Sequence, residues 1–184
     1  GGSVFVDGEP VESPRLETAL ILQDFGLMPW KTVEQNAALG LQVRRLPKKE
    51  RMKRAHDALR RVGLGDFFRS YPAELSGGMR QRLAMARALL HDTPIYLFDE
   101  ATSNVDAESE NDIMAAIRGL AGKKTVILIS HRLANVVDSD CIYVLDKGRI
   151  AERGTHAELL KKQGAYSRLY TAQKQLETLE TEDA

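Results

Sequence analysis

Leu75-Ser76-Gly77-Gly78-Met79-Arg80-Gln81-Arg82 is the stretch of this 184-residue chain that says most about its fold. Ser76 is a residue type favoured as a helix N-cap, and the two glycines allow a ligand to approach the backbone closely. The first N–H groups of the helix that follows lack intrahelical acceptors and carry partial positive charge. The stretch therefore predicts a helix start that can bind a phosphate group.

Further along the chain, an apolar run over 95–98 predicts a strand, and Asp99 and Glu100 follow it directly. One carboxylate can hold Mg²⁺ through its water shell, and the other can orient or deprotonate an attacking water. An Asp-Glu pair taken alone is more typical of a surface turn. The longer run Asp99-Glu100-Ala101-Thr102-Ser103-Asn104-Val105-Asp106 is far more specific than the pair.

The remainder of the C-terminal half alternates between strand and helix patterns, which predicts an α/β fold with parallel strands. Strands are expected over 95–98, 125–129 and 141–146, with helices over about 107–119 and 132–138. The first two strands are continuously apolar, as is typical of strands covered on both faces. His131, like the carboxylate pair, follows a strand end, where ligands bind in open α/β sheets.

The N-terminal half adds short strands and a group of helices. Strands are expected over 3–8 and 18–23, and Thr32 with Gln35 predicts a capping box for a helix ending near Gln42. A second helix begins near Pro47, and its outer face is strongly basic. That face is either simply solvated or in contact with an acidic partner or lipid headgroups. Its cations are Lys48, Lys49, Arg51, Lys53, Arg54, Arg60 and Arg61.

Composition excludes some classes of protein. The formal net charge is zero, which argues against a nucleic-acid binder that relies on bulk charge. Cys141 is the single cysteine, so no internal disulfide can form. No apolar stretch approaches the roughly 18 to 20 residues that span a bilayer. Work at a membrane would therefore proceed through a partner.

Taken together, the two motifs above resemble the signature and Walker B segments of ATP-binding-cassette (ABC) ATPases, the nucleotide-binding domains of ABC transporters. The resemblance covers essentially the whole chain. It implies ATP as the ligand, bound in a head-to-tail sandwich of two such domains. By this resemblance Ser76, Gly77 and Gly78 contact the γ-phosphate held by the opposite domain, and Asp106 crosses the dimer interface.

The same resemblance assigns the catalytic residues. Asp99 corresponds to the Walker B aspartate at the Mg²⁺ site, and Glu100 to the catalytic carboxylate. Gln23 corresponds to the Q-loop glutamine, which reaches the Mg²⁺ site and senses the transporter partner. His131 corresponds to the switch histidine that contacts the γ-phosphate. A lone histidine after an apolar strand is more often structural, but four motifs in the correct order reverse that preference.

We expect a single partial ABC ATPase domain over 1–184. Its α/β catalytic core, of the P-loop NTPase type with a largely parallel sheet and flanking helices, would comprise 1–23 and 92–160. The Q-loop and a helical signature subdomain would occupy 24–91, and a C-terminal helix and tail 161–184. The expected partners are a second ABC ATPase domain, identical or different, and transmembrane domains, at the cytoplasmic face of the cell membrane, without nucleic acid.

The P-loop pattern G-x-x-x-x-G-K-[ST], with which such enzymes grip the nucleotide, occurs nowhere in the 184 residues. We therefore expect that the N-terminal part of the core is missing from this sequence and that residues 1–184 are inactive alone. One alternative is a naturally degenerate, non-catalytic module that completes the ATP site of another subunit. Another is a soluble ABC ATPase that acts on DNA or ribosomes.

The direction of transport is ambiguous in the sequence. The stretch 23–33 resembles importer ATPases for small anions such as sulfonates or nitrate. By contrast, 99–110, 130–134 and 154–160 resemble exporter domains that are fused to membrane helices. The exporter-like part is longer and receives more weight. The transported substrate cannot be read from the chain, because the membrane domains select it.

Overall fold

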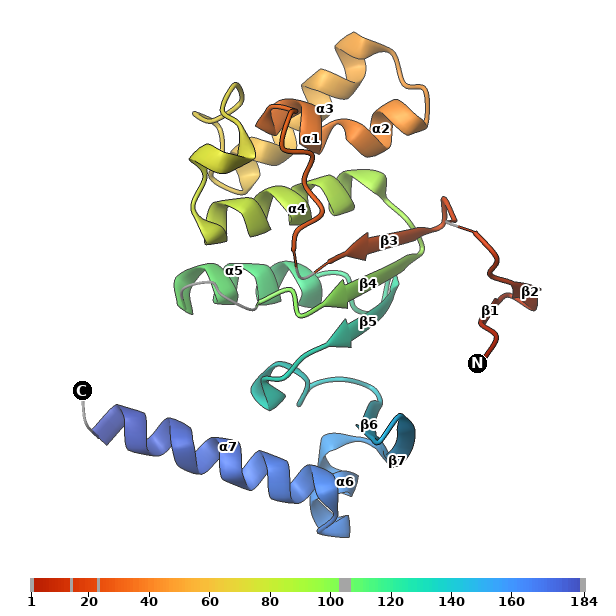
Figure 1. The fold of residues 1–184 in the computed structure, drawn as a ribbon, viewed down its shortest axis with the longest axis vertical. Helices are drawn as coiled ribbons and strands as arrows, with labels where there is room; N and C mark the ends of the chain where they lie inside the picture. The colour runs from red at the N-terminus through yellow and green to blue at the C-terminus, as the bar shows by residue number, and fades with distance from the viewer. Residues whose placement is uncertain (1, 14, 23, 103–106, 183–184) are drawn as a thin grey trace. The chain divides into compact units, whose positions relative to one another are not determined.

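The computed structural model of the chain describes residues 2–13, 15–22, 24–102 and 107–182. The chain forms two compact units, Gly1–Ile129 and Ser130–Ala184. Figure 1 shows the helices and strands of both units. Helices and strands alternate through much of the chain, which confirms the predicted α/β class.

A three-stranded parallel sheet forms the centre of the first unit (Figure 1). Its strands are β3 (Thr18–Ile21), β4 (Ile95–Asp99) and β5 (Thr125–Ile129). The central strand β4 pairs with both neighbours, with Ile21 beside Phe98 and Asp99 beside Ile129. The carboxyl ends of the strands therefore meet at one edge of the sheet, and the parallel pairing predicted for 95–98 and 125–129 is confirmed.

One face of this sheet is covered and the other is open. The covered face packs against α4 (Gly77–His91) and α5 (Ala107–Arg118). On the open face, Leu20, Ile127 and Ile129 are 49%, 47% and 48% exposed. The expectation that the apolar run ending at Ile129 is covered on both faces is therefore wrong in this structure. A continuously apolar strand is stabilised when other elements pack on both of its faces. The pattern of the strand does not determine whether another segment packs there.

The helices between β3 and β4, which we call the helical subdomain, pack around a second hydrophobic core. Its elements are α1 (Val33–Ala37), α2 (Leu39–Val43), α3 (Lys48–Arg61), a 3-10 turn η1 (Pro72–Glu74) and α4. The predicted capping box at Thr32 and Gln35 is confirmed, but the single helix expected to reach Gln42 is two short helices that meet at Ala38. Ala38 is buried, so packing decides where the chain turns.

Helix α4 connects the two cores of the first unit. Ala84, Met85 and Ala88 face the core of the sheet, whereas Leu83 and Ala86 face the core of the helical subdomain. A helix with apolar residues on two sides is buried between two layers. The middle of α4 is therefore held from both sides.

A small hairpin precedes the sheet. Strands β1 (Phe5–Val6) and β2 (Glu9–Pro10) pair in antiparallel fashion. Asp7 and Gly8 in the connection have φ angles of 53° and 82°. Asp-Gly is a typical pair for a two-residue hairpin turn with left-handed backbone, so the turn predicted in the stretch 3–8 is confirmed.

The second unit contains a hairpin and two helices. Its elements are a 3-10 turn η2 (Leu133–Asn135), β6 (Ile142–Asp146), β7 (Arg149–Gly154), α6 (His156–Lys162) and α7 (Ala165–Glu182). Among the described residues, β6 pairs only with β7 and is antiparallel to it, so it does not extend the parallel sheet. The helix expected over 132–138 is a single 3-10 turn.

Side-chain hydrogen bonds to backbone N–H groups stabilise the starts of both helices in this unit. A capping box of Thr155 and Glu158 starts α6. The Glu152 carboxylate accepts hydrogen bonds from the backbone N–H groups of Ala165 (2.5 Å) and Tyr166 (3.1 Å) at the start of α7. Within the described part of the chain, no helix combines the length and the apolarity needed to cross a bilayer.

Candidate functional site

The first turn of α4 has the geometry expected of a phosphate-binding helix start. Ser76 is the N-cap, with φ −65° and ψ 166°, and its Oγ accepts a hydrogen bond from the Met79 N–H at 3.2 Å. The N–H groups of Gly77 and Gly78, earlier in the turn, have no acceptor four residues before them. They remain suited to an anion at this position.

The charges around this helix start favour an anion. The first turn of α4 contains no acidic residue, whereas α1, α3 and α6 carry Glu34, Glu50 and Glu158 there. Arg80 and Arg82 follow within the next turn instead. Carboxylates stabilise a helix N-terminus but would repel a phosphate. α4 therefore lacks the electrostatic stabilisation that these other helices have and leaves its N-terminus to a ligand.

The two predicted carboxylates lie at the carboxyl edge of the sheet. Asp99 is the last residue of β4, and Glu100 follows it with φ 49°. The Glu100 N–H donates a 3.0 Å hydrogen bond to the Ile129 carbonyl at the end of β5. Left-handed backbone at a non-glycine residue is uncommon and ends the extended run abruptly. The turn places both carboxyl groups, each partly buried, where the strand stops.

The loop after β3 is anchored to α4 by an arginine that sequence reasoning missed. The Arg87 guanidinium donates hydrogen bonds to the carbonyls of Phe25 (2.8 Å) and Gly26 (2.6 Å). Both loop residues have positive φ, 64° and 55°. Arg80 lies over the Phe25 ring at 5.8 Å. Burial lowers the pKa of Arg87 from its ordinary value, and the two carbonyls compensate part of that cost.

A buried asparagine anchors the rest of the same loop. Asn36 of α1 is fully buried. Its Oδ1 accepts from the Met28 N–H at 2.8 Å, and its Nδ2 donates to the carbonyls of Met28, Lys31 and Thr32 at 2.9–3.1 Å. The side chain of Trp30 nevertheless remains 70% exposed. The loop thus has a fixed backbone and an exposed aromatic side chain.

The histidine predicted as a switch lies in the second unit, between β5 and η2. The His131 carbonyl accepts a hydrogen bond from Gln173 Nε2 of α7 at 3.3 Å, and Gln173 Oε1 accepts from the Leu133 N–H at 2.8 Å. Ser130 Oγ accepts from the Arg132 N–H at 3.0 Å. Gln173 therefore holds the backbone of the histidine turn. Sequence reasoning gave no hint of this, because a glutamine on a helix has no distinguishing pattern.

The structure places the predicted residues on separate elements. Asp99 and Glu100 share the carboxyl edge of the sheet, Ser76 to Gly78 begin α4, and His131 belongs to the second unit. Gln23 and Asp106 lie outside the described residues. Of the five predicted positions in the first unit that are described, each is at the end of a helix or a strand, where catalytic and binding groups are commonly held.

These donor sets fit parts of a Mg²⁺–nucleotide site. Carboxylate oxygens are ligands that Mg²⁺ prefers, and this ion keeps several waters in its shell. The residues described contain no cluster of three or more histidine, cysteine or acidic side chains of the kind that encloses a metal. Asp99 and Glu100 are suited instead to an ion held largely by water and by phosphate oxygens. The amides of Gly77 and Gly78 are suited to a phosphate.

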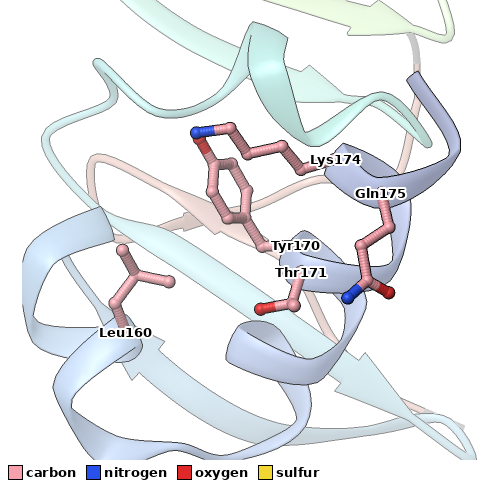
Figure 2. A pocket seen from close by; sticks show the side chains of 5 residues that line it. All are labelled: Leu160, Tyr170, Thr171, Lys174 and Gln175. Carbon is pink, nitrogen blue, oxygen red and sulfur yellow. The ribbon is translucent and has the colours of Figure 1, made fainter. Parts of the chain in front are cut away.

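A shallow pocket of about 420 Å³ lies elsewhere, on the second unit. Figure 2 shows Leu160 of α6 facing side chains of α7 across it. The α7 residues are Tyr170, Thr171, Lys174 and Gln175. No residue predicted from the sequence lines it. A surface hollow with no acidic group is a poor candidate for metal-dependent chemistry.

Comparison with known proteins agrees with these motifs. A family model described as "ABC transporter" matches residues 1–103. An ATP-dependent lipid A-core flippase of Cupriavidus metallidurans is 39% identical over 188 residues, which cover 94% of this chain and 31% of that protein. The chain spans about a third or less of the first curated relatives it matches, with 19% and 31% of their lengths covered.

Two solved structures resemble the chain. A bacterial Atm1-family ABC exporter with ATP bound has a TM-score of 0.80 and 32% identity, over 94% of this chain and 32% of that chain. A dimeric ATP-binding cassette in a post-hydrolysis state, bound to ADP and phosphate, has a TM-score of 0.77 and 27% identity. The second match covers 85% of this chain and 74% of that one.

Proposed function

Since this chain belongs to the ABC transporter family, we propose that it forms the larger part of an ATPase cassette that powers transport across a membrane. The observation that carries the proposal is the pairing of two features. One is the acid-free, serine-capped start of α4, and the other is the carboxylate pair at the end of β4. A helix with a purely structural role would not require an acid-free start. A surface turn would not require two carboxylates at the end of a buried strand.

We assign roles to the residues as follows. Ser76, Gly77 and Gly78 bind the terminal phosphate of a nucleotide held by a second cassette, as the helix N-terminus allows. Mg²⁺, when bound, neutralises charge that develops on the phosphate oxygens. Asp99 holds the water shell of this ion, and Glu100 orients and deprotonates the attacking water.

The remaining predicted residues complete this assignment. His131 contacts the terminal phosphate. The two hydrogen bonds between Gln173 and the backbone of the His131 turn, one donated and one accepted by Gln173, support a positional role. Gln23, which comes two positions after the last residue of β3 in the sequence, reaches the Mg²⁺ site. The carboxyl end of β3 lies at the same sheet edge as Asp99. Asp106 crosses the interface between two cassettes.

The assembly we propose is a head-to-tail dimer of two cassettes attached to transmembrane domains at the cytoplasmic face of a membrane. The dimeric cassette bound to ADP and phosphate supports the first part. The flippase and the exporter with ATP bound support the second, and they favour export over import, because each match covers 94% of this chain. Trp30, exposed on an anchored loop, is our candidate for contact with a membrane domain.

We further propose that the cassette is divided by function. Residues 1–23 and 92–160 form the catalytic core, and 161–184 form a C-terminal helix and tail. Residues 24–91 form the helical signature subdomain, which has a hydrophobic core of its own in support. Arg87 and Asn36 connect the loop at the start of this subdomain to its helices.

The test is the substitution Glu100→Gln in a full-length transporter that contains this chain. The amide keeps the size of the side chain but cannot accept the proton, so steady-state phosphate release should fall at least about 100-fold. ATP binding, measured with a fluorescent analogue, should persist. Glu12→Gln, an exposed residue outside the site, is the matched control. Wild-type phosphate release by the Glu100 variant would contradict the assignment and favour a non-catalytic module.

A further inference from the structure

An exposed group of basic side chains lies where α2 joins α3 and is unused by the proposed site. We call Arg44, Arg45, Lys48, Lys49 and Lys53 the basic corner. The stretch 43–54 that contains it carries seven Lys and Arg residues but one acid, in a chain whose net charge is zero. The other residues together therefore carry a net charge of −6. Figure 1 shows the connection between α2 and α3 that carries these residues.

The fold itself uses little of this charge. Arg54 is paired with Glu50, and Arg51 donates a hydrogen bond to the Leu46 carbonyl at 3.4 Å. Arg44 lies near enough to Asp92 to help lower its pKa. The other four cations of the corner are all exposed, and none of them forms a salt bridge within the described residues. α3 buries Ala55 and Leu59 on its other side.

The placement of the lysines is unfavourable for the isolated helix. Lys48 and Lys49 are the first two residues of α3, where the helix dipole disfavours positive charge. Lys49 and Lys53 are four residues apart, so two like charges are neighbours on the helix surface. An anionic partner would relieve both effects.

We propose that the basic corner binds the anionic headgroups of a lipid bilayer. The choice of partner rests on the proposed function, which places the chain at a membrane. Three of the five cations are lysines, which act as mobile point charges suited to a diffuse anionic surface, whereas specific carboxylate pairing favours arginine forks. Val43 at the end of α2 is 58% exposed beside them and adds an apolar contact. The other class of partner, an acidic protein segment, is an outcome of the test.

The experiment is vesicle flotation of the 184-residue chain without nucleotide. We expect the chain to float with vesicles of equal parts phosphatidylcholine and phosphatidylglycerol at low salt, but not with phosphatidylcholine alone. Added sodium chloride should release it, because exposed charges are screened. Replacing Lys48, Lys49 and Lys53 together by Gln should weaken binding about 100-fold, at roughly fivefold for each cation.

The matched control replaces three other exposed lysines, Lys123, Lys147 and Lys161, by Gln. It makes the same change in net charge and should leave binding unchanged. An equal loss of vesicle binding in both triple variants would overturn the proposal, because it would show that binding depends on the net charge of the chain and not on the basic corner. Flotation with pure phosphatidylcholine would indicate apolar adsorption and would also overturn it. Far-UV circular dichroism checks that both variants are folded.

A further arm uses immobilised polyglutamate as the acidic polypeptide. Retention on polyglutamate without flotation would overturn the lipid assignment in favour of an acidic protein partner. No ATP is present in the assay, so a negative result leaves the proposed ATPase function intact. Conversely, if the Glu100→Gln test contradicted the ATPase assignment, the result of the vesicle assay would still stand.

Discussion

The helical subdomain and the parallel sheet of the first unit satisfy their hydrophobic patterns to different extents. In the subdomain, Ala55, Leu59, Leu64 and Leu83 are fully buried, and helices cover them from several sides. In the sheet, α4 and α5 cover one face, while Leu20, Ile127 and Ile129 project from the other. The strands of the sheet are the more apolar of the two regions in sequence, so apolar composition alone does not secure cover.

The difference shows that burial of apolar side chains depends on how far apart in the sequence the packing segments lie. The elements that enclose the core of the helical subdomain all lie within residues 33–91 and are joined by short connections. The parallel sheet instead collects strands from residues 18 to 129, and a parallel strand requires a crossover connection to each neighbour. A region whose packing segments are close in sequence can bury its own apolar side chains. A sheet whose strands come from distant segments exposes apolar side chains wherever no segment packs against it.

The largest expected effect compares the two regions directly. Leu83→Ala removes a fully buried side chain between four helices and should lower the free energy of unfolding by about 2–5 kcal/mol. Ile127→Ala on the open sheet face should lower it by no more than about 1 kcal/mol, since about half of this residue is already exposed. Urea unfolding followed by circular dichroism measures both. Equal losses would mean that the open face is covered in solution.

The buried asparagine tests the second largest effect. Asn36→Ala leaves the Met28 N–H and three carbonyls without their partner and should cost about 2–3 kcal/mol. Asn36→Asp keeps the acceptor but loses the donors, and it should be no more stable. Trp30, the single tryptophan, lies in the anchored loop, so its fluorescence reports the change. An unchanged midpoint and spectrum would show that Asn36 does not hold the loop.

The start of α4 should show a smaller effect. Ser76→Ala removes the cap on the Met79 N–H and should destabilise the chain by about 1 kcal/mol. Ser76→Thr keeps a hydroxyl and should lose only part of this. Thermal unfolding without nucleotide measures the structural contribution alone. A neutral alanine variant would mean that the cap contributes nothing to the fold, which would sharpen its assignment to phosphate binding.

The smallest expected effect is a dependence on pH at the far end of α4. Burial, with the nearby charge of Arg44 adding to it, lowers the pKa of His91. Because the unfolded chain protonates this histidine near pH 6.5 and the folded chain only at lower pH, stability should fall as the pH drops below about 6.5. The loss ends below the folded-state pKa. The lowered pKa of Asp92, held mainly by Lys124, acts only in a more acidic range.

His91→Gln should therefore flatten the pH dependence between pH 8 and pH 5. The comparison of urea midpoints for the two proteins at both pH values isolates the contribution of this residue. A steeper slope in the His91 variant would show that the sign of the pKa change is wrong.

Most of the local structure could be predicted from residues that act on their immediate neighbours. The caps at Thr32, Ser76 and Thr155 form as their side chains predict, since each satisfies an N–H group three residues away. The strand over 125–129 begins and ends as predicted. The helix over 107–118 differs from its expected end by one residue. Such features depend on local hydrogen bonds, which sequence patterns report well.

The candidate site is divided in the same way. The sequence motifs identify the carboxylates and the helix start, because their chemistry depends on residue type and spacing. The roles of Arg87, Asn36 and Gln173 were not predictable, since each binds a backbone carbonyl or amide that a side chain reaches only in the folded chain. Gln173 acts on a turn 40 residues earlier. No periodicity or motif marks such a contact.

The sequence by itself determined the α/β class, the caps, the strand ends and the residue types that a phosphate and a metal ion require. The tertiary structure decided that residues 33–43 form two helices, that β6 pairs only with β7 among the described strands, and that one sheet face is open. The physical reason is the distance along the sequence over which each interaction acts. Hydrogen bonds and dihedral preferences act over a few residues, whereas burial depends on which distant segments arrive to exclude water.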